Sequence, residues 1–491
     1  MPSIALTLPG AAVPTDPPAQ LLPRTAPRLL RLADGVLLGG LALITLAATA
    51  VLTVALYERF NAFSLAALVV WLLAMTLIAR QAVAGRIDWR ALFALVLLSL
   101  LMRWWSVQLT MEVELRVDPM NYTNLATAVL DGRGLIVDDV QYGRDLRAYF
   151  PPLYPLLLAG WWALFGVSAW ATLAMNTLTD AIAAWALADT GRRLGNRAAG
   201  LLAGLAYFAW PAFALGAGLP QKEALTVLLG VLLLRGLVIW LNADAAGARR
   251  WRHGLWLGLW WGMLALTQAG LAVAPAFIAL VLIWQRGFAA TLRLGLTALP
   301  ALLAVLLPWW LRNWLVFGAF VPLTTASGFM ANSALVHIRA PFPPGIFDLP
   351  EPERSKVMGE LARGILLGNP VCAAGEYARS MARGFAFEEA SLARYRHTVP
   401  AISADNHARL EVMLQGSWAT LLASATLATW ARLRRGLTDP VALYTLALLA
   451  AIGLTNVWFE FGERHRLILT PFLLLLAAGF WTGWLKRKAQ R

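Results

Sequence analysis

The sequence has few charged residues and almost no cysteine. Only 14% of its 491 residues are charged, whereas about 25% is usual in soluble domains, and 59% are hydrophobic. This composition excludes an ordinary soluble globular domain. The single cysteine, Cys372, excludes an intramolecular disulfide and a thiolate metal cluster.

Histidine is also scarce, with five in the chain. His465 has no second histidine at metal-ligand spacing, and His337, His397 and His407 stand isolated, so a zinc site built by the protein is not expected. We interpret Asp138 and Asp139 as solvated loop charges rather than metal ligands. We therefore assign no cofactor or metal ligand, and a divalent cation is left open.

Acidic residues are outnumbered by basic ones, 27 to 41, which gives a formal net charge of +14. The basic residues cluster in short segments between apolar runs, which is typical of cytoplasmic loops and not of a nucleic-acid surface. These clusters are Arg80, Arg86 and Arg90; Arg192, Arg193 and Arg197; Arg249, Arg250 and Arg252; Arg286 and Arg293; Arg432, Arg434 and Arg435; and Lys486, Arg487 and Lys488. The partner implied is a lipid bilayer and not nucleic acid.

Apolar runs of roughly 20 residues recur, and each can cross about 30 Å of hydrocarbon. They predict an all-α polytopic membrane protein with about twelve transmembrane helices. The predicted spans are 36–56, 61–79, 90–109, 168–188, 198–214, 222–241, 254–268, 270–285, 292–311, 417–433, 440–458 and 466–485. The run 151–165 is a thirteenth candidate.

The positions of the basic loops indicate whether run 151–165 crosses the membrane. If the N-terminus is cytoplasmic and this run crosses, the basic loops near residues 192, 249 and 432 all lie outside. If the run is re-entrant or lies in the outer interface, all of them lie inside, together with the C-terminal tail. We therefore predict twelve spans and an interfacial or re-entrant helix at 151–165.

This topology divides the chain into six parts and places two large loops outside the membrane. The parts are a disordered cytoplasmic tail (1–35), three transmembrane helices (36–109), a first extracytoplasmic loop with interfacial helices (110–167), a transmembrane core (168–312), a large extracytoplasmic loop (313–416), and C-terminal transmembrane helices with a cytoplasmic tail (417–491). A helix is expected in the second loop after Asn369-Pro370. The first span is interpreted as uncleaved, and the setting as a bacterial inner membrane with the site facing the periplasm.

The first loop has the features expected of a catalytic loop. Asp118 precedes a helical run that ends at Gly132 and Gly134. A polar segment follows and closes on Tyr149-Phe-Pro-Pro-Leu-Tyr-Pro155, whose prolines break any arriving helix. Asp118 is therefore the candidate catalytic residue, and an N-cap of the helix is the simpler alternative.

Ionisable and polar residues also gather at the outer ends of later spans. Charge at the edge of hydrocarbon is costly and usually marks a site. These residues are Lys222 and Glu223; Arg312 and Asn313; and Glu460, Glu463, Arg464, His465 and Arg466. Arginines could hold a lipid-borne phosphate, while Asp118 takes a proton from an attacking hydroxyl. The simpler alternatives are interfacial anchors and a Lys222–Glu223 pair.

In these motifs the chain resembles the GT-C superfamily of polyprenyl-phosphate-sugar-dependent glycosyltransferases, on the branch of the protein O-mannosyltransferases and the lipid A aminoarabinose transferase. The resemblance covers about residues 95–485. Its motifs are Asp118-x3-Tyr122-x3-Ala126 with Gly132 and Gly134, Pro151-Pro-Leu-Tyr-Pro-Leu-Leu-Leu-Ala159 to Leu164-Phe-Gly166, Gln221-Lys-Glu223, Pro308-Trp-Trp-Leu-Arg-Asn313, Phe317-Gly318, Val321-Pro-Leu323, and Gly462-Glu-Arg-His-Arg466 before Thr470-Pro-Phe472.

The resemblance implies inverting transfer of a sugar from a polyprenyl phosphate to an acceptor hydroxyl, with Asp118 at the family's first-loop acidic position. The residues expected at the donor phosphate are Lys222, Arg312, Arg464 and Arg466, and those expected at the substrates are Tyr122, Tyr149, Tyr154, Glu223, Gln268, Asn313, Glu463 and His465. The chain departs from the family in three ways: Pro119 replaces a second acid, Gln268 replaces an arginine, and two extra spans precede the first loop.

Other functions remain open at this point. The acceptor could be a lipid, a polysaccharide or a protein. A transporter or flippase for lipid-linked glycans would place polar residues at mid-membrane, where Arg103, Asp180 and Arg235 are the main candidates. A glycan ligase would share the donor class and require a long lipid-linked glycan.

Overall fold

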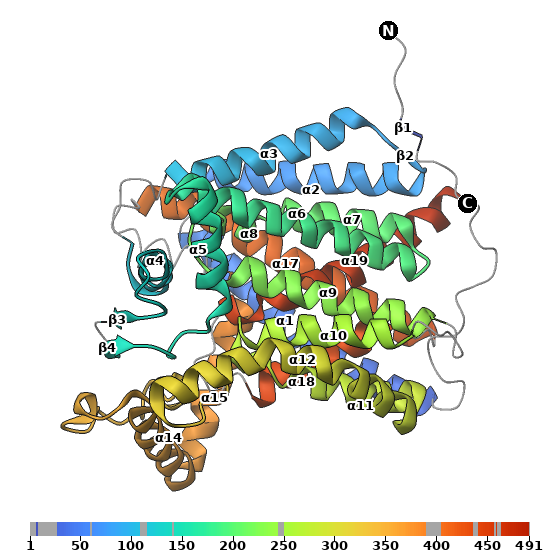
Figure 1. The fold of residues 1–491 in the computed structure, drawn as a ribbon. Helices are drawn as coiled ribbons and strands as arrows, with labels where there is room; N and C mark the ends of the chain where they lie inside the picture. Colours follow the sequence, from blue (N-terminus) through green and yellow to red (C-terminus); the bar gives the residue numbers. More distant parts are fainter. Residues whose placement is uncertain are drawn as a thin grey trace.

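Long helices that run side by side form most of the molecule (Figure 1). The computed structural model describes residues 6–7, 27–58, 61–108, 115–139, 142–243, 250–388, 404–435, 440–455, 458 and 463–490. One end of the bundle carries the shorter helices and strands of the two long loops. The opposite end carries the C-terminus.

A helix lies on each of the twelve predicted spans. These helices are α1 (Pro27–Glu58), α2 (Ala62–Val83), α3 (Trp89–Gln108), α6 (Ala169–Arg193), α7 (Arg197–Phe208) with α8 (Pro211–Gly216), α9 (Glu223–Asn242), α10 (Arg250–Ala265), α11 (Ala274–Arg286), α12 (Phe288–Phe317), α17 (Ala404–Arg435), α18 (Pro440–Leu454) and α19 (Thr470–Ala489). In the described residues, eight helices are long and apolar enough to cross a membrane, or up to nine if a bent pair counts as one span. The chain is therefore a multi-pass membrane protein, and the count of twelve stays a prediction.

The run 151–165 forms a helix that turns sharply away from the bundle. α5 (Leu153–Phe165) meets α6 at 119°. Gly166, at φ 82°, ends α5, and the Ser168 side chain caps α6 by accepting a hydrogen bond from the Ala171 N–H. The indole N–H groups of Trp161 and Trp162 donate across this corner to α6. A bend of this size fits a re-entrant or interfacial helix and also a broken span, so the assignment of run 151–165 stays a prediction.

Two boundaries differ from the prediction. The tail was expected to run to residue 35, but α1 already begins at Pro27, because its first nine residues continue the helical apolar pattern. The second loop was expected to end at 416, but α17 begins at Ala404. Within that loop lie α13 (Ser327–Ala334), a 3-10 helix η2 (Ile346–Asp348), α14 (Glu351–Gly368) and α15 (Pro370–Ala386), the last of which confirms the helix predicted after Asn369-Pro370.

Two small antiparallel ladders interrupt the all-helical pattern. β1 (Leu6–Thr7) pairs with β2 (Arg86–Ile87). In the first loop, β3 (Val137–Asp139) pairs with β4 (Gly143–Leu146), with Val137 opposite Leu146. The sequence did not predict either ladder, because strands this short carry no periodicity of their own.

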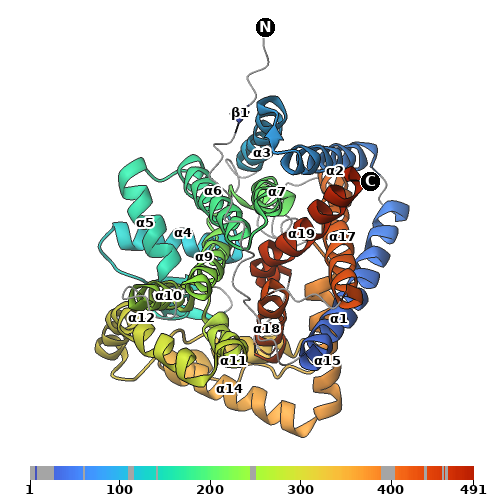
Figure 2. The ribbon, with the colours of Figure 1, turned by 90° about the vertical axis from the view of Figure 1, so that its right-hand side faces the viewer.

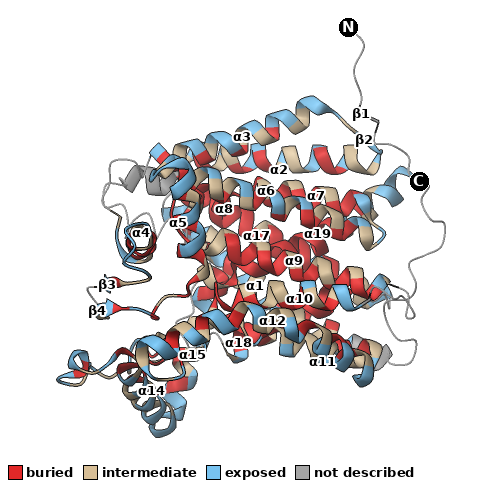
Figure 3. Ribbon diagram, in the orientation of Figure 1, coloured by how far each residue is buried: buried red, intermediate tan, exposed pale blue. Residues whose placement is uncertain are grey.

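The protein core lies among the central helices, and the outer helices expose apolar side chains. Seen along the bundle in Figure 2, α9, α18 and α19 lie near the centre and α1, α2 and α3 lie at the rim. Figure 3 shows that burial follows this arrangement, with α9, α17 and α19 mostly buried. Leu43 and Leu46 on α1 and Leu73 on α2 are 64–70% exposed. A belt of exposed leucines around a bundle fits contact with lipid.

A stripe of glycines allows α10 and α12 to pack closely. Gly254, Gly258 and Gly262 face α12, and a Cβ atom at Gly258 would overlap the Ala298 carbonyl. Small residues four apart are a common way for helices in membranes to approach each other. Because α10 leads directly to Gln268 and α12 to the second loop, this contact fixes two elements of the candidate site.

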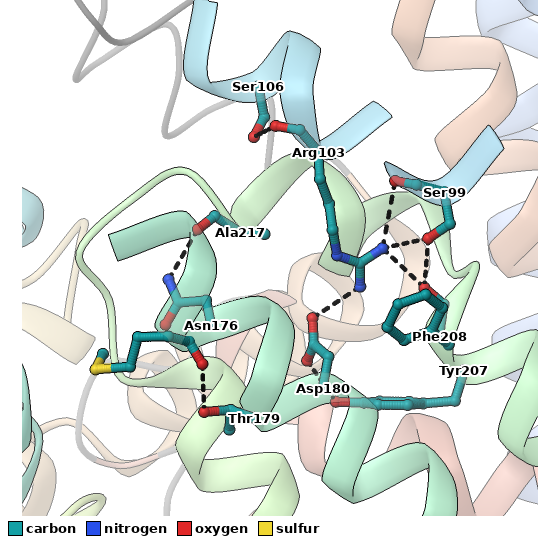
Figure 4. Close-up of polar contacts among 10 residues, drawn as sticks. Ser99, Arg103, Ser106, Asn176, Thr179, Asp180, Tyr207, Phe208 and Ala217 are labelled. Carbon is teal, nitrogen blue, oxygen red and sulfur yellow. Dashed lines mark hydrogen bonds and ion pairs between the residues drawn. The ribbon is translucent and has the colours of Figure 1, made fainter. Parts of the chain in front are cut away.

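Charged residues that the sequence places at mid-membrane are paired with one another. Arg103 of α3 donates to Asp180 of α6 at 2.9 Å, and the Tyr207 hydroxyl of α7 donates to the same carboxylate at 2.9 Å (Figure 4). Both ions are 1% exposed. Arg235 of α9 similarly donates to Asp189 of α6 at 2.8 Å. These contacts tie α3, α7 and α9 to α6, and they account for the central charges without a transport pathway.

Candidate active site

A cavity of about 790 Å³ opens at the end of the bundle that carries the two long loops. Its walls come from seven stretches of the chain: the start of α4 (Val117–Leu130) with Arg116, the pair Asp139 and Tyr142, residues 149–151, Lys222, residues 268–270, residues 322–330 and residues 464–465. Seven of the predicted site residues line it: Asp118, Tyr122, Tyr149, Lys222, Gln268, Arg464 and His465. The fold therefore gathers about half of the predicted site in one place.

Asp118 forms an ion pair with Arg464 at the cavity wall. Asp118 is the second residue of α4, and the N-cap position belongs to Arg116, so the N-cap interpretation of Asp118 is wrong. Val117 has a φ of 56°, a left-handed conformation that is unusual for a β-branched residue and directs the start of the helix. Both charged side chains are partly exposed, 18% for Asp118 and 23% for Arg464, so they remain accessible from the cavity.

Arg464 and His465 lie on η4 (Glu463–Leu469), a 3-10 helix that continues into α19. Arg466 lies on the same short helix but points into the protein. Its guanidinium is fully buried, pairs with Glu388, and lies 3.5 Å above the Trp418 ring centroid. The structure therefore does not bring Arg466 to the cavity, and this burial does not support its expected role at the donor phosphate. The side chain of Glu463, another predicted site residue, lies outside the described residues.

Lys222 and Gln268 reach the cavity from two neighbouring helix starts. Lys222 is the N-cap residue of α9, and Gln268 is the N-cap residue of the 3-10 helix η1 (Ala269–Leu271). Asn176 of α6 holds the segment before Lys222 by donating to the carbonyls of residues 217 and 219, each at 2.9 Å. Glu223, the first residue of α9, lines a small adjoining pocket together with Gln268, Arg464 and His465.

Aromatic side chains form the inner wall of the cavity. Tyr122 packs edge-on against Phe150 and Tyr154, with ring centroids 5.5 and 5.2 Å apart. Tyr154 therefore supports Tyr122 from behind and is absent from the cavity lining. Burial, and then the negative charge of Asp118, raise the pKa of Tyr122 well above its usual value of 10.0. The Tyr122 hydroxyl is therefore a neutral hydrogen-bond donor at the cavity wall, and it has no partner within the described part of the chain.

Asn313 and Arg312 lie behind the first loop and do not line the cavity. The Asn313 side chain is buried and donates to the Val321 carbonyl at 2.9 Å, which fixes the turn after α12. Arg312 donates to the Asn313 side chain at 2.9 Å and to the Leu135 carbonyl at 3.3 Å. Both residues therefore support loop segments, and neither lines the cavity.

Asp139, which the sequence analysis interpreted as a solvated loop charge, is instead half-buried and lines the cavity. Its carboxylate accepts from the Asn121 side chain at 2.6 Å and from the Tyr142 N–H at 3.0 Å. These bonds hold β3 against α4 and turn the carboxylate inward. The only signal in the sequence was an acid in a polar loop, which does not distinguish Asp139 from its neighbour Asp138.

A second missed residue, Glu351, joins the two long loops. Its buried carboxylate, at the start of α14, accepts from the backbone N–H groups of Arg147 at 2.7 Å and Ala148 at 3.0 Å, and from the Thr325 hydroxyl. Arg354, one helical turn further on, donates to the Tyr142 carbonyl at 3.3 Å. The second loop therefore fixes the part of the first loop that forms one cavity wall.

No group of three or more histidine, cysteine, aspartate or glutamate side chains within the described residues could hold a metal ion. The groups that line the cavity are instead two acids, Asp118 and Asp139, with three cations, Arg116, Lys222 and Arg464. Such a set can bind an anionic group and exchange a proton with a hydroxyl.

Residues 150–311, a third of the chain, match the model of the dolichyl-phosphate-mannose-protein mannosyltransferase family. This match confirms the resemblance to lipid-phosphate-sugar glycosyltransferases over these residues. A search of the curated proteins finds no match to the chain.

Among solved structures, the oligosaccharyltransferase AglB from Archaeoglobus fulgidus, in complex with an inhibitory peptide and a dolichol-phosphate, matches at 13% identity and a TM-score of 0.45 over 79% of this chain and 50% of its own. ArnT from Cupriavidus metallidurans bound to undecaprenyl phosphate matches at 16% identity and a TM-score of 0.40, over 80% of this chain and 78% of its own. The chain thus spans about half the length of the archaeal oligosaccharyltransferase.

Proposed function

We propose that the protein is a membrane glycosyltransferase that moves a sugar from a polyprenyl phosphate to an acceptor hydroxyl, with inversion at the sugar. The observation that carries this proposal is the Asp118–Arg464 ion pair in the cavity wall. It brings a carboxylate from an early loop to a guanidinium from the end of the chain. The family match over residues 150–311 supports the same class of reaction.

In the proposed reaction, Asp118 is the general base. The acceptor hydroxyl gives its proton to the Asp118 carboxylate while its oxygen forms a bond to the anomeric carbon of the sugar. The bond between that carbon and the phosphate oxygen breaks at the same time, and its electron pair leaves with the polyprenyl phosphate. Attack opposite the leaving group inverts the anomeric configuration.

Arg464 and Lys222 would stabilise the leaving phosphate. As the sugar–phosphate bond breaks, negative charge grows on the phosphate oxygen, and nearby fixed cations lower the energy of that state. A forked guanidinium such as that of Arg464 suits two phosphate oxygens at once. The neutral hydroxyl of Tyr122 and the side chains of Gln268 and His465 would then contact the sugar or the acceptor.

We further propose that the cavity faces the extracytoplasmic side of a bacterial inner membrane. The distribution of basic residues supports this orientation, with twelve crossings and α5 in the outer interface. The polyprenyl chain would stay in the bilayer while its phosphate reaches the cavity. The acceptor could be a lipid, a polysaccharide or a protein.

Two alternatives use the same donor class. A flippase would move the lipid-linked sugar across the membrane, but the mid-membrane ions Arg103, Asp180 and Arg235 are paired within the helix bundle. A ligase would require a long glycan on the lipid. The paired central charges favour the transferase over the flippase.

The proposal is tested by incubating purified protein with a panel of polyprenyl-phosphate monosaccharides and a membrane extract that supplies acceptors. We expect one donor to lose its sugar and to yield free polyprenyl phosphate, detected by mass spectrometry. A flippase would leave every donor intact in this assay. A ligase would leave the monosaccharide donors intact and consume only a lipid-linked oligosaccharide added in a separate arm.

A further inference from the structure

A second groove lies in the half of the bundle away from the candidate active site. It has a volume of about 250 Å³ and is walled by α2, α7, α17 and α19. One end lies at mid-depth, at Trp71 and Trp210, and the other lies where α2 and α19 end, at Arg80 and Leu485. In Figure 1 these helix ends lie opposite the end that carries α4 and α14.

Several polar groups in the wall of this groove already form hydrogen bonds within the protein. The indole N–H groups of Trp71 and Trp481 donate to the Ala209 carbonyl and the Ser424 hydroxyl, at 2.9 and 3.1 Å. The hydroxyl of Thr76 donates to a carbonyl of its own helix at 2.9 Å. Between these groups the wall consists largely of alanine and leucine side chains. An occupant that meets this wall is therefore apolar.

The length of the groove matches one leaflet of a membrane. From Trp71 to Arg80, α2 advances nine residues, or about 14 Å at about 1.5 Å per residue. One leaflet contributes half of a hydrocarbon core of about 30 Å. An acyl chain that enters beside Arg80 would therefore end near the buried indoles.

Basic side chains lie at only one end of the groove, the end near Arg80. Arg80 lines it, is exposed, and forms no ion pair within the described residues. The last turn of α19 adds Lys486, Arg487 and Lys488, and the Lys488 ammonium lies 5.4 Å from the ring centroid of Trp484, a groove residue. No acidic side chain is among the described residues that line the groove. Basic residues around a gap between membrane helices attract anionic lipid headgroups.

We propose that this groove binds one anionic phospholipid from the leaflet opposite the candidate active site. One acyl chain would lie along Ala203 and Ala478 between α7 and α19, and the phosphate would lie at Arg80. The site is independent of the proposed transfer reaction, because it shares no lining residue with the catalytic cavity. The bound lipid would hold α2, at the rim of the bundle, against the buried helix α19.

The test is native mass spectrometry of the full chain released from nanodiscs of phosphatidylcholine that contain phosphatidylglycerol. We expect one phosphatidylglycerol molecule to stay bound to the wild-type protein. Removal of a single basic side chain near the membrane surface weakens attraction to an anionic lipid by about fivefold, so Arg80→Gln should reduce the bound fraction by about that factor. Ala203→Leu, which places a larger side chain in the wall of the groove, should also reduce it.

Arg86→Gln is the matched control, because Arg86 lies at the same end of the bundle, is exposed and does not line the groove. It should leave the bound fraction unchanged. Equal losses in Arg80→Gln and Arg86→Gln would overturn the proposal, and so would equal retention of phosphatidylcholine and phosphatidylglycerol. Preferential retention of undecaprenyl phosphate, added in a third arm, would also contradict it. If Ala203→Leu does not fold, the two arginine variants decide the outcome.

Discussion

At the scale of single residues, the Asp118–Arg464 pair joins two positions that are 346 apart in the sequence. The predicted topology could place this acid and this cation on the same side of the membrane. Asp118 follows one predicted span and Arg464 precedes another, and both ends lie on that side. The topology could not predict which of Arg464 and Arg466 faces the cavity. The two lie on a 3-10 helix with about three residues per turn, so side chains two positions apart point to different sides. An α-helix would separate them as well, so the sequence could predict that only one of the two faces the cavity but not which one.

The buried ion pair Arg103–Asp180 makes a quantitative prediction at this scale. Asp180→Leu leaves the Arg103 guanidinium buried without its carboxylate, and breaking a buried pair in this way costs about 3–5 kcal/mol. We expect Asp180→Leu to lower the thermal unfolding midpoint of the purified protein strongly. The double variant Arg103→Met with Asp180→Leu should recover most of this loss, because it leaves no unpaired charge. A double variant no more stable than Asp180→Leu would show that the pair does not act as a unit.

At the scale of elements, the corner between α5 and α6 is the irregular feature that the sequence indicated most directly. The positions of the basic loops predicted that run 151–165 does not cross the membrane, and Gly166 and Ser168 supply a helix stop and a helix cap. The contact between the two loops at Glu351 could not be predicted. Glu351 binds backbone N–H groups about 200 residues away, and nothing in either local sequence specifies that partner.

The contact between α10 and α12 gives a prediction at the same scale. Gly258→Val would place a branched side chain against the Ala298 backbone, where neither helix can yield without separating. Overpacking of this kind costs about 1–3 kcal/mol or more. We expect a lower unfolding midpoint and aggregation in size-exclusion chromatography. Gly295→Val on α12 is the matched control, since a Cβ there meets nothing within 4 Å, and equal behaviour of the two variants would contradict the packing argument.

At the scale of the whole molecule, composition predicted a multi-pass helical membrane protein, and the positions of the helices followed from the apolar runs. What composition could not predict is the arrangement of the loops over one end of the bundle. The cavity needs residues from α4, α9, η1 and η4 together, and their meeting depends on packing between helices that are distant in sequence. For the same reason Asp139, placed by its bond to Asn121, was not identified beforehand.

The orientation of the whole molecule can be measured with the one native cysteine. Cys372 is exposed on α15, in the second loop. If that loop is extracytoplasmic, a membrane-impermeant maleimide should label Cys372 on intact cells. The double variant Cys372→Ser with Ala84→Cys moves the thiol to the opposite end of the bundle and should label only after lysis. The reverse pattern would invert the proposed topology.

The central claim is that Asp118 accepts the proton of the acceptor in a cavity that Arg464 completes. The most direct measurement is the turnover number of purified Asp118→Asn with the donor identified in the panel. The account predicts a loss of about 10²- to 10⁴-fold, the usual contribution of a general base. Asp131→Asn, at the end of the same helix and 59% exposed beside Arg133, should keep wild-type turnover. Near-normal turnover of Asp118→Asn, in a protein as stable as the wild type, would contradict the account.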